Sequence, residues 1–422
     1  MATFRFLHCA DLHLDSPLRG LEADPDAPAE RIRGATREAL QNLIDFAVNE
    51  QVDFVVAAGD LYDGDWPDWR TGRFLIAQIR QLTDAGIPFI AIRGNHDAES
   101  VITRRLRMPS ELARVLDHMA PETYRLAHLP VSIHGQSFAT KAVTENLALA
   151  YPAPDPERFN IGLLHSSVGD REGHDTYASC SVEQLRTVGY DYWALGHIHK
   201  AEVLHKDPWI VFPGNLQGRK INETGPKGAS LVTVTDGKIV DVSTKYFDVV
   251  RWARIDVVLA EEADEDSALA QVRAALAGEL ENAEGRLLAA RIVLSGACAA
   301  HEAFSRDIGA AREKIRAEAL AVAGHGTIWT EMVDIATGPS AAIRAMEERQ
   351  DATGQLIRAL REANPGEITD GIRSYANAML DKANPLRQAI GAENQTVLVA
   401  QGEPPDHLIQ QARDLLLGKL AV

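Results

Sequence analysis

The sequence predicts an α/β fold, in which helices cover a sheet of buried strands. Short apolar runs at Phe4–Cys9 and Phe54–Ala58 have the length and composition of buried strands. The segment Ala29–Glu50 between them carries apolar residues at helical spacing, and so does Thr71–Ala85, which precedes a third strand at Pro88–Ile92. Strands that alternate with helices in this way are typical of α/β sheets.

Polar side chains follow five predicted strands, at the point where each strand ends. Beyond the first three strands, the apolar runs Asn160–Leu164 and Tyr192–Leu195 are the other two. The polar residues at these strand ends are Asp11, His13, Asp60, Asn95, His165, His197 and His199. Loops that leave the carboxyl ends of strands in an α/β sheet cluster on one edge, and ligands bind there. We therefore expect these side chains to converge on one point.

Donors of these types indicate a divalent metal site. Carboxylate, amide and imidazole groups without cysteine suit manganese, iron, zinc or magnesium, and they do not suit a structural zinc closed by thiolates. The donors are too many for one open catalytic site, but they fill two sites if one carboxylate bridges. Two ions held roughly 3.5–4 Å apart can stabilise both the attacking and the leaving oxygen of an in-line phosphoryl displacement.

The same residues form five motifs in a fixed order: Asp11-Leu-His13, Gly59-Asp60, Gly94-Asn-His-Asp97, a lone His165, and Gly196-His-Ile-His199. This pattern resembles the calcineurin-like metallophosphoesterase superfamily. Within it, the chain is most similar to the SbcD/Mre-type DNA repair nucleases and their YhaO branch, on the stretches His165–Cys180, Gly189–Lys200 and Phe212–Arg219. The resemblance covers residues 1–250 and implies a four-layer α/β/β/α sandwich. Beyond residue 250 only the layout is similar.

The resemblance also implies a role for each motif residue. Metal one takes Asp11, His13, Asp60 and His199, and metal two takes Asp60, Asn95, His165 and His197, with Asp60 bridging the two. His96 stays off the metals and assists departure of the ester oxygen. Asp97 is expected to orient the His96 imidazole or to raise its pKa. Manganese is the first expectation for both ions, and iron, magnesium or zinc would also suit the donors.

One position departs from the family pattern. Double-strand exonucleases of this family often carry histidine after the Gly-Asp-Leu-aromatic stretch, whereas this chain has Asp63 there. In those enzymes the histidine is tied to exonuclease action on duplex ends. The departure leaves strand preference, polarity and the choice between exonuclease and endonuclease action open, and it leaves phosphodiester hydrolysis as the expectation.

Three residues are candidates for substrate contact. Arg219 lies near the site by resemblance and is expected to hold a phosphate, a role that Lys220 would also suit. His174 stands in a polar loop and is either a surface group or a substrate contact. Trp66, like Trp69, is either an anchor at the start of a helix or an aromatic platform for an unpaired base.

Further elements are expected along the chain. Predicted strands at Val131–His134 and Phe138–Lys141 would build a second sheet, and those at Trp209–Phe212, Gly228–Val234 and Lys238–Lys245 complete a run of β strands. Ser181–Val188 reads as a short helix with Ser181 as its N-cap. The arginine-rich stretch Val101–Met119 is predicted to be helical. It is either a solvated face or, by resemblance, part of a homodimer contact and DNA cradle.

The length of 422 residues exceeds what one core usually holds, so we expect three regions. Residues 1–250 form the metallophosphoesterase domain. Residues 251–338 form a small α+β domain, with helices at Glu261–Leu276 and Glu302–Val322 and strands at Arg286–Leu294 and Gly326–Val333. By resemblance this domain caps the site and contacts DNA. Residues 339–422 are mainly helical, and their last apolar stripe either packs on its own domain or docks on an SMC-like coiled-coil ATPase.

Composition and charge limit which partners and which compartment are expected. With 45% hydrophobic and 24% charged residues, the chain has the composition of a soluble globular protein. A formal charge of −17 argues against a surface that binds nucleic acid everywhere, but it is compatible with a local basic groove. The 3 cysteines are widely spaced, and Arg5 and His8 interrupt the apolar start, so no disulfide framework, signal peptide or membrane partner is expected. Cytoplasmic residence follows by default.

Three functions are weighed. The first is a metal-dependent DNA nuclease that works with an SMC-like ATPase, as the motifs and the long C-terminal extension suggest. The second is a phosphodiesterase or phosphatase on a small molecule, which the motifs alone do not reject. The third is a non-catalytic scaffold, which the complete set of candidate ligands argues against.

Overall fold

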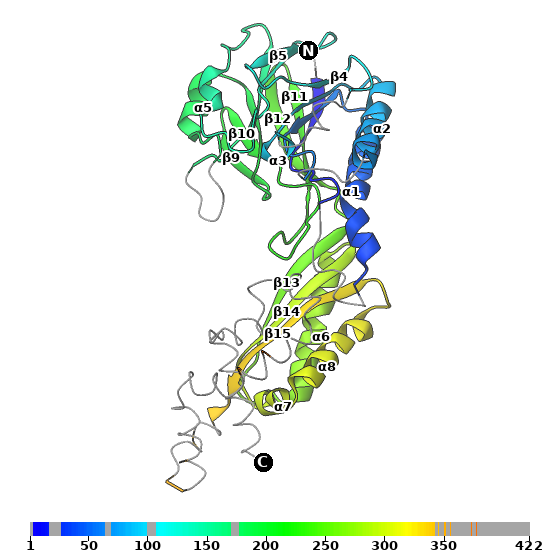
Figure 1. Ribbon diagram of the computed structural model, residues 1–422, viewed down its shortest axis with the longest axis vertical. Helices are drawn as coiled ribbons and strands as arrows, with labels where there is room; N and C mark the ends of the chain where they lie inside the picture. Colours follow the sequence, from blue (N-terminus) through cyan, green and yellow to red (C-terminus); the bar gives the residue numbers. More distant parts are fainter. Residues whose placement is uncertain are drawn as a thin grey trace. The chain divides into compact units, whose positions relative to one another are not determined.

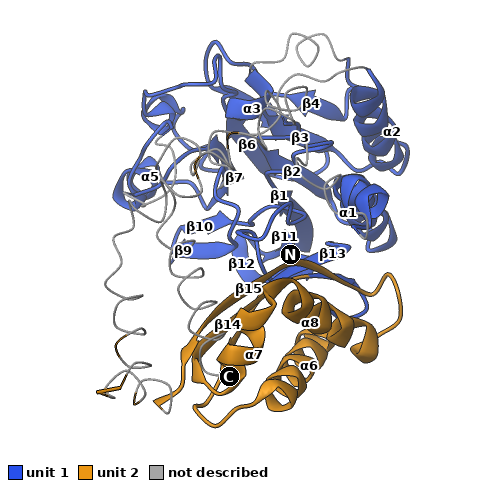
Figure 2. Ribbon diagram, turned by 60° about the horizontal axis from the view of Figure 1, so that its bottom comes forward, with its two compact units in different colours: residues 1–253, 283–289 blue, residues 254–282, 290–422 orange. Residues whose placement is uncertain are grey.

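The computed structural model describes residues 3–16, 27–63, 69–98, 107–169 and 177–341, with a few single positions beyond. Contacts divide the chain into two compact units, residues 1–253 with 283–289 and residues 254–282 with 290–422 (Figure 2). Three predictions lie outside the described residues: the contacts of Trp66 and His174, and the helices of the C-terminal region.

The first unit contains two six-stranded sheets (Figure 1). The first sheet has the order β12-β11-β1-β2-β3-β4, with bounds Lys238–Tyr246, Gly228–Thr235, Thr3–Cys9, Phe54–Ala58, Phe89–Ile92 and Ala113–Val115. The second has the order β5-β6-β7-β8-β10-β9, with bounds Glu122–Arg125, Val131–Gly135, Phe159–His165, Tyr192–Gly196, Trp209–Phe212 and Glu202–Lys206. Strands β1 to β4 run parallel, and so do β6, β7, β8 and β10, so each sheet has a parallel centre.

Alternation along the strands builds four layers. Phe6 on β1 faces the second sheet, and its ring centroid lies 5.3 Å from that of Tyr192 on β8, while Leu7 faces the opposite side. On that side α1 (Ala29–Asn49) and α2 (Arg70–Asp84) cover the first sheet. The 3-10 helix η2 (Leu147–Ala150) and α5 (Val182–Val188) cover the outer face of the second sheet. This arrangement confirms the predicted α/β/β/α sandwich.

Most predicted elements of this unit are present within one or two residues of their expected ends, including the serine-capped helix α5. Two predictions are wrong. In the described part of Val101–Met119 there is a strand, β4, because pairing with the open edge of β3 overrides local helical preference. Phe138–Lys141 is not a strand, because Phe138 donates its N–H to the carbonyl of Arg93 and packs its ring 5.5 Å from that of His165.

The three-stranded sheet belongs mainly to the second unit. It has the order β13-β14-β15, with bounds Val250–Val258, Leu287–Cys298 and Ile328–Pro339, and it is joined by α6 (Glu265–Asn282), α7 (Ala300–Arg306) and α8 (Ile308–Val322). The helix predicted over Glu302–Val322 is interrupted at Asp307, whose side chain caps α8 by accepting the N–H of Ala310 at 2.9 Å. None of the described helices combines the length and the apolar composition that a membrane span requires.

A buried histidine joins the two sheets of the sandwich. His8 on β1 is fully buried, its Nε2 lies 3.1 Å from the carbonyl oxygen of Leu195, and its Nδ1 lies 3.0 Å from the hydroxyl of Tyr192. Because a carbonyl only accepts, Nε2 carries the proton and Nδ1 accepts from the hydroxyl. Burial lowers the pKa of His8 from 6.5 to about 3, so the ring is neutral at pH 7.

The first prediction concerns acid stability. In the unfolded chain His8 takes up a proton below pH 6.5, whereas in the folded chain it does so only at about pH 3. The contribution of His8 to stability is therefore complete above pH 6.5 and is lost as the pH falls from 6.5 to about 3. We expect His8→Gln to be less stable at pH 7 by about 1–3 kcal/mol. Its stability should then decline less steeply with acid, by about 1.4 kcal/mol per pH unit relative to the wild type. Urea unfolding at pH 7, 6 and 5 measures both. Parallel curves for the two proteins would contradict the assignment.

Candidate metal centre

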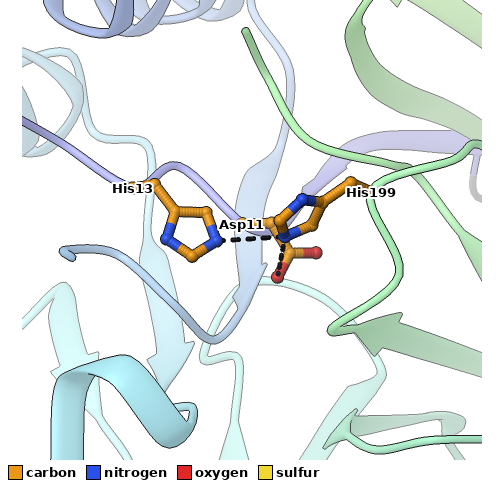
Figure 3. Close-up of side chains that lie close together, drawn as sticks. All are labelled: Asp11, His13 and His199. Carbon is orange, nitrogen blue, oxygen red and sulfur yellow. Dashed lines mark hydrogen bonds and ion pairs between the residues drawn. The ribbon is translucent and has the colours of Figure 1, made fainter. Parts of the chain in front are cut away.

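The carboxyl ends of the central strands of both sheets bring the candidate ligands together. Among the described residues, three groups have ligand atoms within 4.8 Å of one another: Asp11 with His13 and His199, His13 with Asp60 and His96, and Asp11 with Asp60 and His165. These side chains lie at or just after the ends of β1, β2, β3, β7 and β8. Figure 3 shows the first group, with the ring of His199 beside the Asp11 carboxylate and the ring of His13 facing it.

His165 directs its Nε2 into this cluster. Its Nδ1 lies 2.9 Å from the carbonyl oxygen of Ala58 and donates a proton to it. Nε2 lies 2.9 Å from Oδ1 of Asn95 and 3.4 Å from Oδ2 of Asp60, which are acceptors. Burial opposes a charge on His165, but Asp60 outweighs burial and raises the pKa of His165 to about 9, so without a metal Nε2 also carries a proton. A metal ion would replace that proton, and Nε2 and the two oxygens would then fit it as ligands.

His199 and His13 present a second pair of ring nitrogens. Their Nε2 atoms are 3.1 Å apart, and Nε2 of His199 lies 3.9 Å from Oδ1 of Asp11. The other nitrogen of His199, Nδ1, lies 2.8 Å from Oε1 of Glu223, which accepts its proton. Nε2 of His199 is therefore an acceptor that faces a carboxylate and a second imidazole. A ring held this way by a carboxylate is a common arrangement of metal-ligating histidines.

His197 lies beside these groups and in none of the three. Its backbone N–H donates to both oxygens of the Asp11 carboxylate, at 3.1 and 3.0 Å, and its ring centroid is 5.3 Å from that of His165. The role of His197 as a ligand stays a prediction.

The backbone of the site is held in an unfavourable conformation. Asp11, His13, Asp60 and His197 have φ of 52°, 42°, 50° and 100°, in the region that favours glycine. Such residues cost about 1–3 kcal/mol each and persist where the surroundings fix them. Here the loops after β1 and β2 fix each other, because the N–H of Asp11 donates to the carbonyl of Gly59 and the N–H of His13 to that of Asp60, both at 3.0 Å.

His96 stands at the rim of the cluster and is held by Asp63. Nδ1 of His96 lies 2.7 Å from Oδ1 of Asp63, and the His96 side chain is 36% exposed, so it can meet a substrate. The hydrogen bond with Asp63 is the largest cause that raises the pKa of His96. Burial opposes ionisation of Asp63, but its bonds with His96 and Ser16 outweigh burial and lower the pKa of Asp63 to about 2.

This geometry corrects the expectation that Asp97 orients the His96 imidazole. The Asp97 carboxylate is buried and accepts the backbone N–H groups of Leu61, Tyr62 and Gly94, at 3.0, 2.9 and 3.0 Å. Neighbouring residues on a helical turn point in different directions, so the Asp97 carboxylate does not hold the imidazole ring of His96. Asp97 instead joins the loops after β2 and β3.

Sequence reasoning missed Glu223 and the contacts of Arg219. Glu223 is 5% exposed; burial opposes its ionisation, but the hydrogen bond from His199 and the charge of Arg219 outweigh burial and lower the pKa of Glu223. The Arg219 guanidinium lies 3.1 Å from Asp63 and 3.1 Å from Glu223. No apolar strand directly precedes Glu223, so the pattern that selected the other residues does not select it. That Arg219 holds a phosphate stays a prediction.

Comparison with known proteins identifies the family. The model of the calcineurin-like phosphoesterases matches residues 4–201, and that of the middle domain of the metallophosphoesterase YhaO matches residues 252–338. The chain is 37% identical over 297 residues to YhaO of Bacillus subtilis (strain 168), a protein named as an uncharacterized metallophosphoesterase, covering 69% of this chain and 71% of that protein. The chain belongs to the YhaO-like family of calcineurin-like metallophosphoesterases. The family uses divalent metals, which the Asp and His groups described above fit.

More distant relatives of this YhaO-like chain are named as DNA double-strand break repair proteins. It is 27% identical over 263 residues to the DNA double-strand break repair protein Mre11 of Sulfurisphaera tokodaii, covering 59% of this chain and 64% of that protein. It is also 27% identical over 273 residues to the protein of the same name from Saccharolobus solfataricus, covering 57% of this chain and 67% of that protein.

The second prediction tests the close packing at the end of β8. A Cβ on Gly196 would overlap the carbonyl oxygen of Ala58 and lie 2.9 Å from Nδ1 of His165, the two atoms whose bond sets the tautomer of His165. We expect Gly196→Ala to lower the free energy of unfolding of the metal-free protein by about 3 kcal/mol. Its affinity for a divalent metal ion should also weaken.

Gly34→Ala on α1 is the matched control, since a Cβ there meets nothing within 4 Å. In a helix interior that change should stabilise by about 0.5–1 kcal/mol. Urea unfolding compares the two variants with the wild type. A Gly196→Ala protein as stable as the wild type would contradict the packing argument.

Proposed function

We propose that this YhaO-like metallophosphoesterase is a divalent-metal-dependent phosphodiesterase that acts on DNA. The observation that carries the proposal is the position of His96, an accessible imidazole held by Asp63 beside a buried cluster of acceptors. A general acid next to two cation sites is what the hydrolysis of a phosphodiester requires, because the leaving oxygen needs a proton and the phosphoryl oxygens need positive charge.

The proposal assigns seven ligands to two ions. Metal one takes Asp11, His13, Asp60 and His199, and metal two takes Asp60, Asn95, His165 and His197. When bound, the ions supply positive charge to the phosphoryl oxygens and activate the attacking water. The side chains of the cluster support this because His165 and His199 each have one ring nitrogen bound by the protein, which leaves the other nitrogen for a ligand. Manganese is proposed for both sites.

His96 supplies the proton in this proposal. Asp63 holds Nδ1 of His96, so Nε2 is the nitrogen that donates to the leaving ester oxygen. The backbone N–H of His96 donates to Oδ1 of Asp60 at 3.0 Å, which ties the acid to the proposed bridging carboxylate. The proton moves from Nε2 to the leaving oxygen as its bond to phosphorus breaks, and His96 returns to its charged form from solvent.

DNA is proposed as the substrate because the archaeal relatives are named as DNA double-strand break repair proteins. The proposal extends to residues 251–338 as a domain that caps the site and contacts DNA. It extends also to residues 339–422 as a docking region for an SMC-like coiled-coil ATPase, and to a homodimer. The runner-up function, hydrolysis of a small phosphodiester or phosphomonoester, is an outcome of the test below.

The third prediction is cleavage of DNA that depends on His96. Metal-free protein is given manganese and labelled single-stranded, blunt duplex and hairpin DNA. We expect cleavage that falls at least about 100-fold in His96→Ala. The control is His128→Ala, which changes an exposed loop histidine that is not a candidate site residue. This variant should cleave DNA as fast as the wild type does.

Two results would contradict the proposal. If no DNA is cut but bis(p-nitrophenyl) phosphate is hydrolysed, the metal chemistry stands and DNA is the wrong substrate. If His96→Ala also loses both metal ions, His96 is a ligand rather than the acid.

The fourth prediction tests the bridging role of Asp60. Its carboxylate lies 3.4 Å from Nε2 of His165 and 3.8 Å from Nε2 of His13, so it faces both proposed sites. Asp60→Asn should therefore lower the stoichiometry of manganese binding from two to one or none, because an amide cannot supply a charged oxygen to each ion. Asp45→Asn on the exposed face of α1 is the control. Isothermal titration of the metal-free proteins measures the stoichiometry, and two ions in Asp60→Asn would contradict the bridge.

A further inference from the structure

The loop that follows β10 holds a saturated, buried carboxylate. Glu223 accepts from Nδ1 of His199 at 2.8 Å, from Nδ2 of Asn215 at 3.0 Å, and from the backbone N–H and Nη2 of Arg219 at 2.8 and 3.1 Å. A carboxylate accepts about four hydrogen bonds, so Glu223 has no capacity left for a ligand. Its place is behind His199, on the side of the ring away from Asp11 and His13.

Arg219 connects this carboxylate with the one that holds His96. Its Nη1 lies 3.1 Å from Oδ2 of Asp63, while its Nη2 lies 3.1 Å from Oε1 of Glu223. The Arg219 side chain is 12% exposed, and its Nε is buried without a partner among the described residues. Both terminal nitrogens of the guanidinium are therefore engaged by the protein, and Nε cannot be reached from solvent.

The same loop is fastened to the segment that precedes and begins β13. Oε1 of Gln217 accepts the N–H groups of Val249 and Val250 at 2.8 and 3.2 Å, and its Nε2 donates to the carbonyl of Val250 at 2.7 Å. Nε1 of Trp252 donates to the carbonyl of Gly218 at 2.9 Å. These bonds hold the two residues that directly precede Arg219, so the backbone that carries Arg219 is fixed.

We propose that Glu223 and Arg219 are positioning residues, which together set the orientation of a metal ligand, His199, and of the acid, His96. This inference rests on the proposed function and deepens it. Glu223 fixes the proton of His199 on Nδ1 and keeps Nε2 directed at Asp11 and His13. Arg219 holds Glu223 and Asp63 at a fixed separation. A carboxylate behind a ligating histidine also raises the basicity of the imidazole, which strengthens its bond to a metal.

The geometry favours this role over phosphate binding by Arg219. An arginine that clamps a phosphate presents its paired N–H groups to the ligand. Here those groups point at Asp63 and Glu223. If Arg219 turned to a substrate, the buried Glu223 and the partly buried Asp63 would lose their cation, which is costly. A positioning residue alters the rate of the bound complex, whereas a residue that binds ground state and transition state equally alters KM.

The fifth prediction concerns metal affinity. Glu223→Gln keeps the size of the side chain but places an amide N–H₂ where two donors meet, so the metal-free protein should melt at a lower temperature than the wild type and still be folded during the titration. We expect one of two manganese ions to bind about 10–100-fold more weakly and the other to keep its affinity. Isothermal titration and the electron paramagnetic resonance signal of free manganese measure this without any turnover. Glu145→Gln, at an exposed position, is the matched control.

Two outcomes overturn the role of Glu223. Unchanged affinity for both ions would show that Glu223 does not support a ligand. Loss of both ions together with loss of the cooperative melting transition would show that Glu223 is needed for the fold instead. A wild-type protein that binds no manganese would defeat the proposed function, which is a different result from an unchanged Glu223→Gln variant.

Arg219 is tested by the split between kcat and KM on bis(p-nitrophenyl) phosphate. Arg219→Ala should lower kcat about 10–100-fold, the scale of losing such a supporting partner, with KM within twofold of the wild type. Arg219→Lys should recover part of kcat, because an ammonium can reach one carboxylate but not bridge both. A rise in KM with unchanged kcat would overturn the positioning role and make Arg219 a phosphate contact.

Discussion

The structure depends on one constraint, which is that two carboxylates lie close together where the strands of both sheets end. Asp11 and Asp60 are buried there with His165, and ligand atoms of all three lie within 4.8 Å of one another. Burying such groups is costly unless a cation joins them, so the fold has to hold them in place against their own repulsion. Four layers provide the rigid frame, and the positive φ of Asp11 and Asp60 is tolerated because the loops that carry them hydrogen-bond to each other.

The sequence was sufficient for the fold because its elements are locally consistent. Alternation on β1 places Phe6 between the sheets and Leu7 under the helices, and the apolar spacing of α1 and α2 matches that outer face. Prediction failed where distant partners decide the conformation. Residues 113–115 form a strand because they pair with the edge of β3. Phe138 is not in a strand, and its ring packs against that of His165. No local pattern carries either contact.

The candidate site divides in a similar way. Residues at strand ends could be found from sequence, because the rule that brings strand ends to one edge needs only the order of strands and helices. Residues that act by positioning other side chains could not be found from the sequence. Glu223 follows no strand, and its relation to His199 appears only when the loop after β10 folds back. Asp97 looked like the partner of His96 because it is adjacent in sequence, yet Asp63 is the partner in space and Asp97 holds backbone instead.

These contacts give a physical reason for the aspartate at position 63. A side chain there has two tasks, since it accepts from Nδ1 of His96 and also faces the guanidinium of Arg219. An ionised aspartate does both with its two oxygens. A histidine has a single acceptor nitrogen when neutral and none when charged, so it could not accept from both Nδ1 of His96 and Nη1 of Arg219. Asp63, Arg219 and Glu223 therefore form one unit, and the identity of any one of them limits what the other two can be.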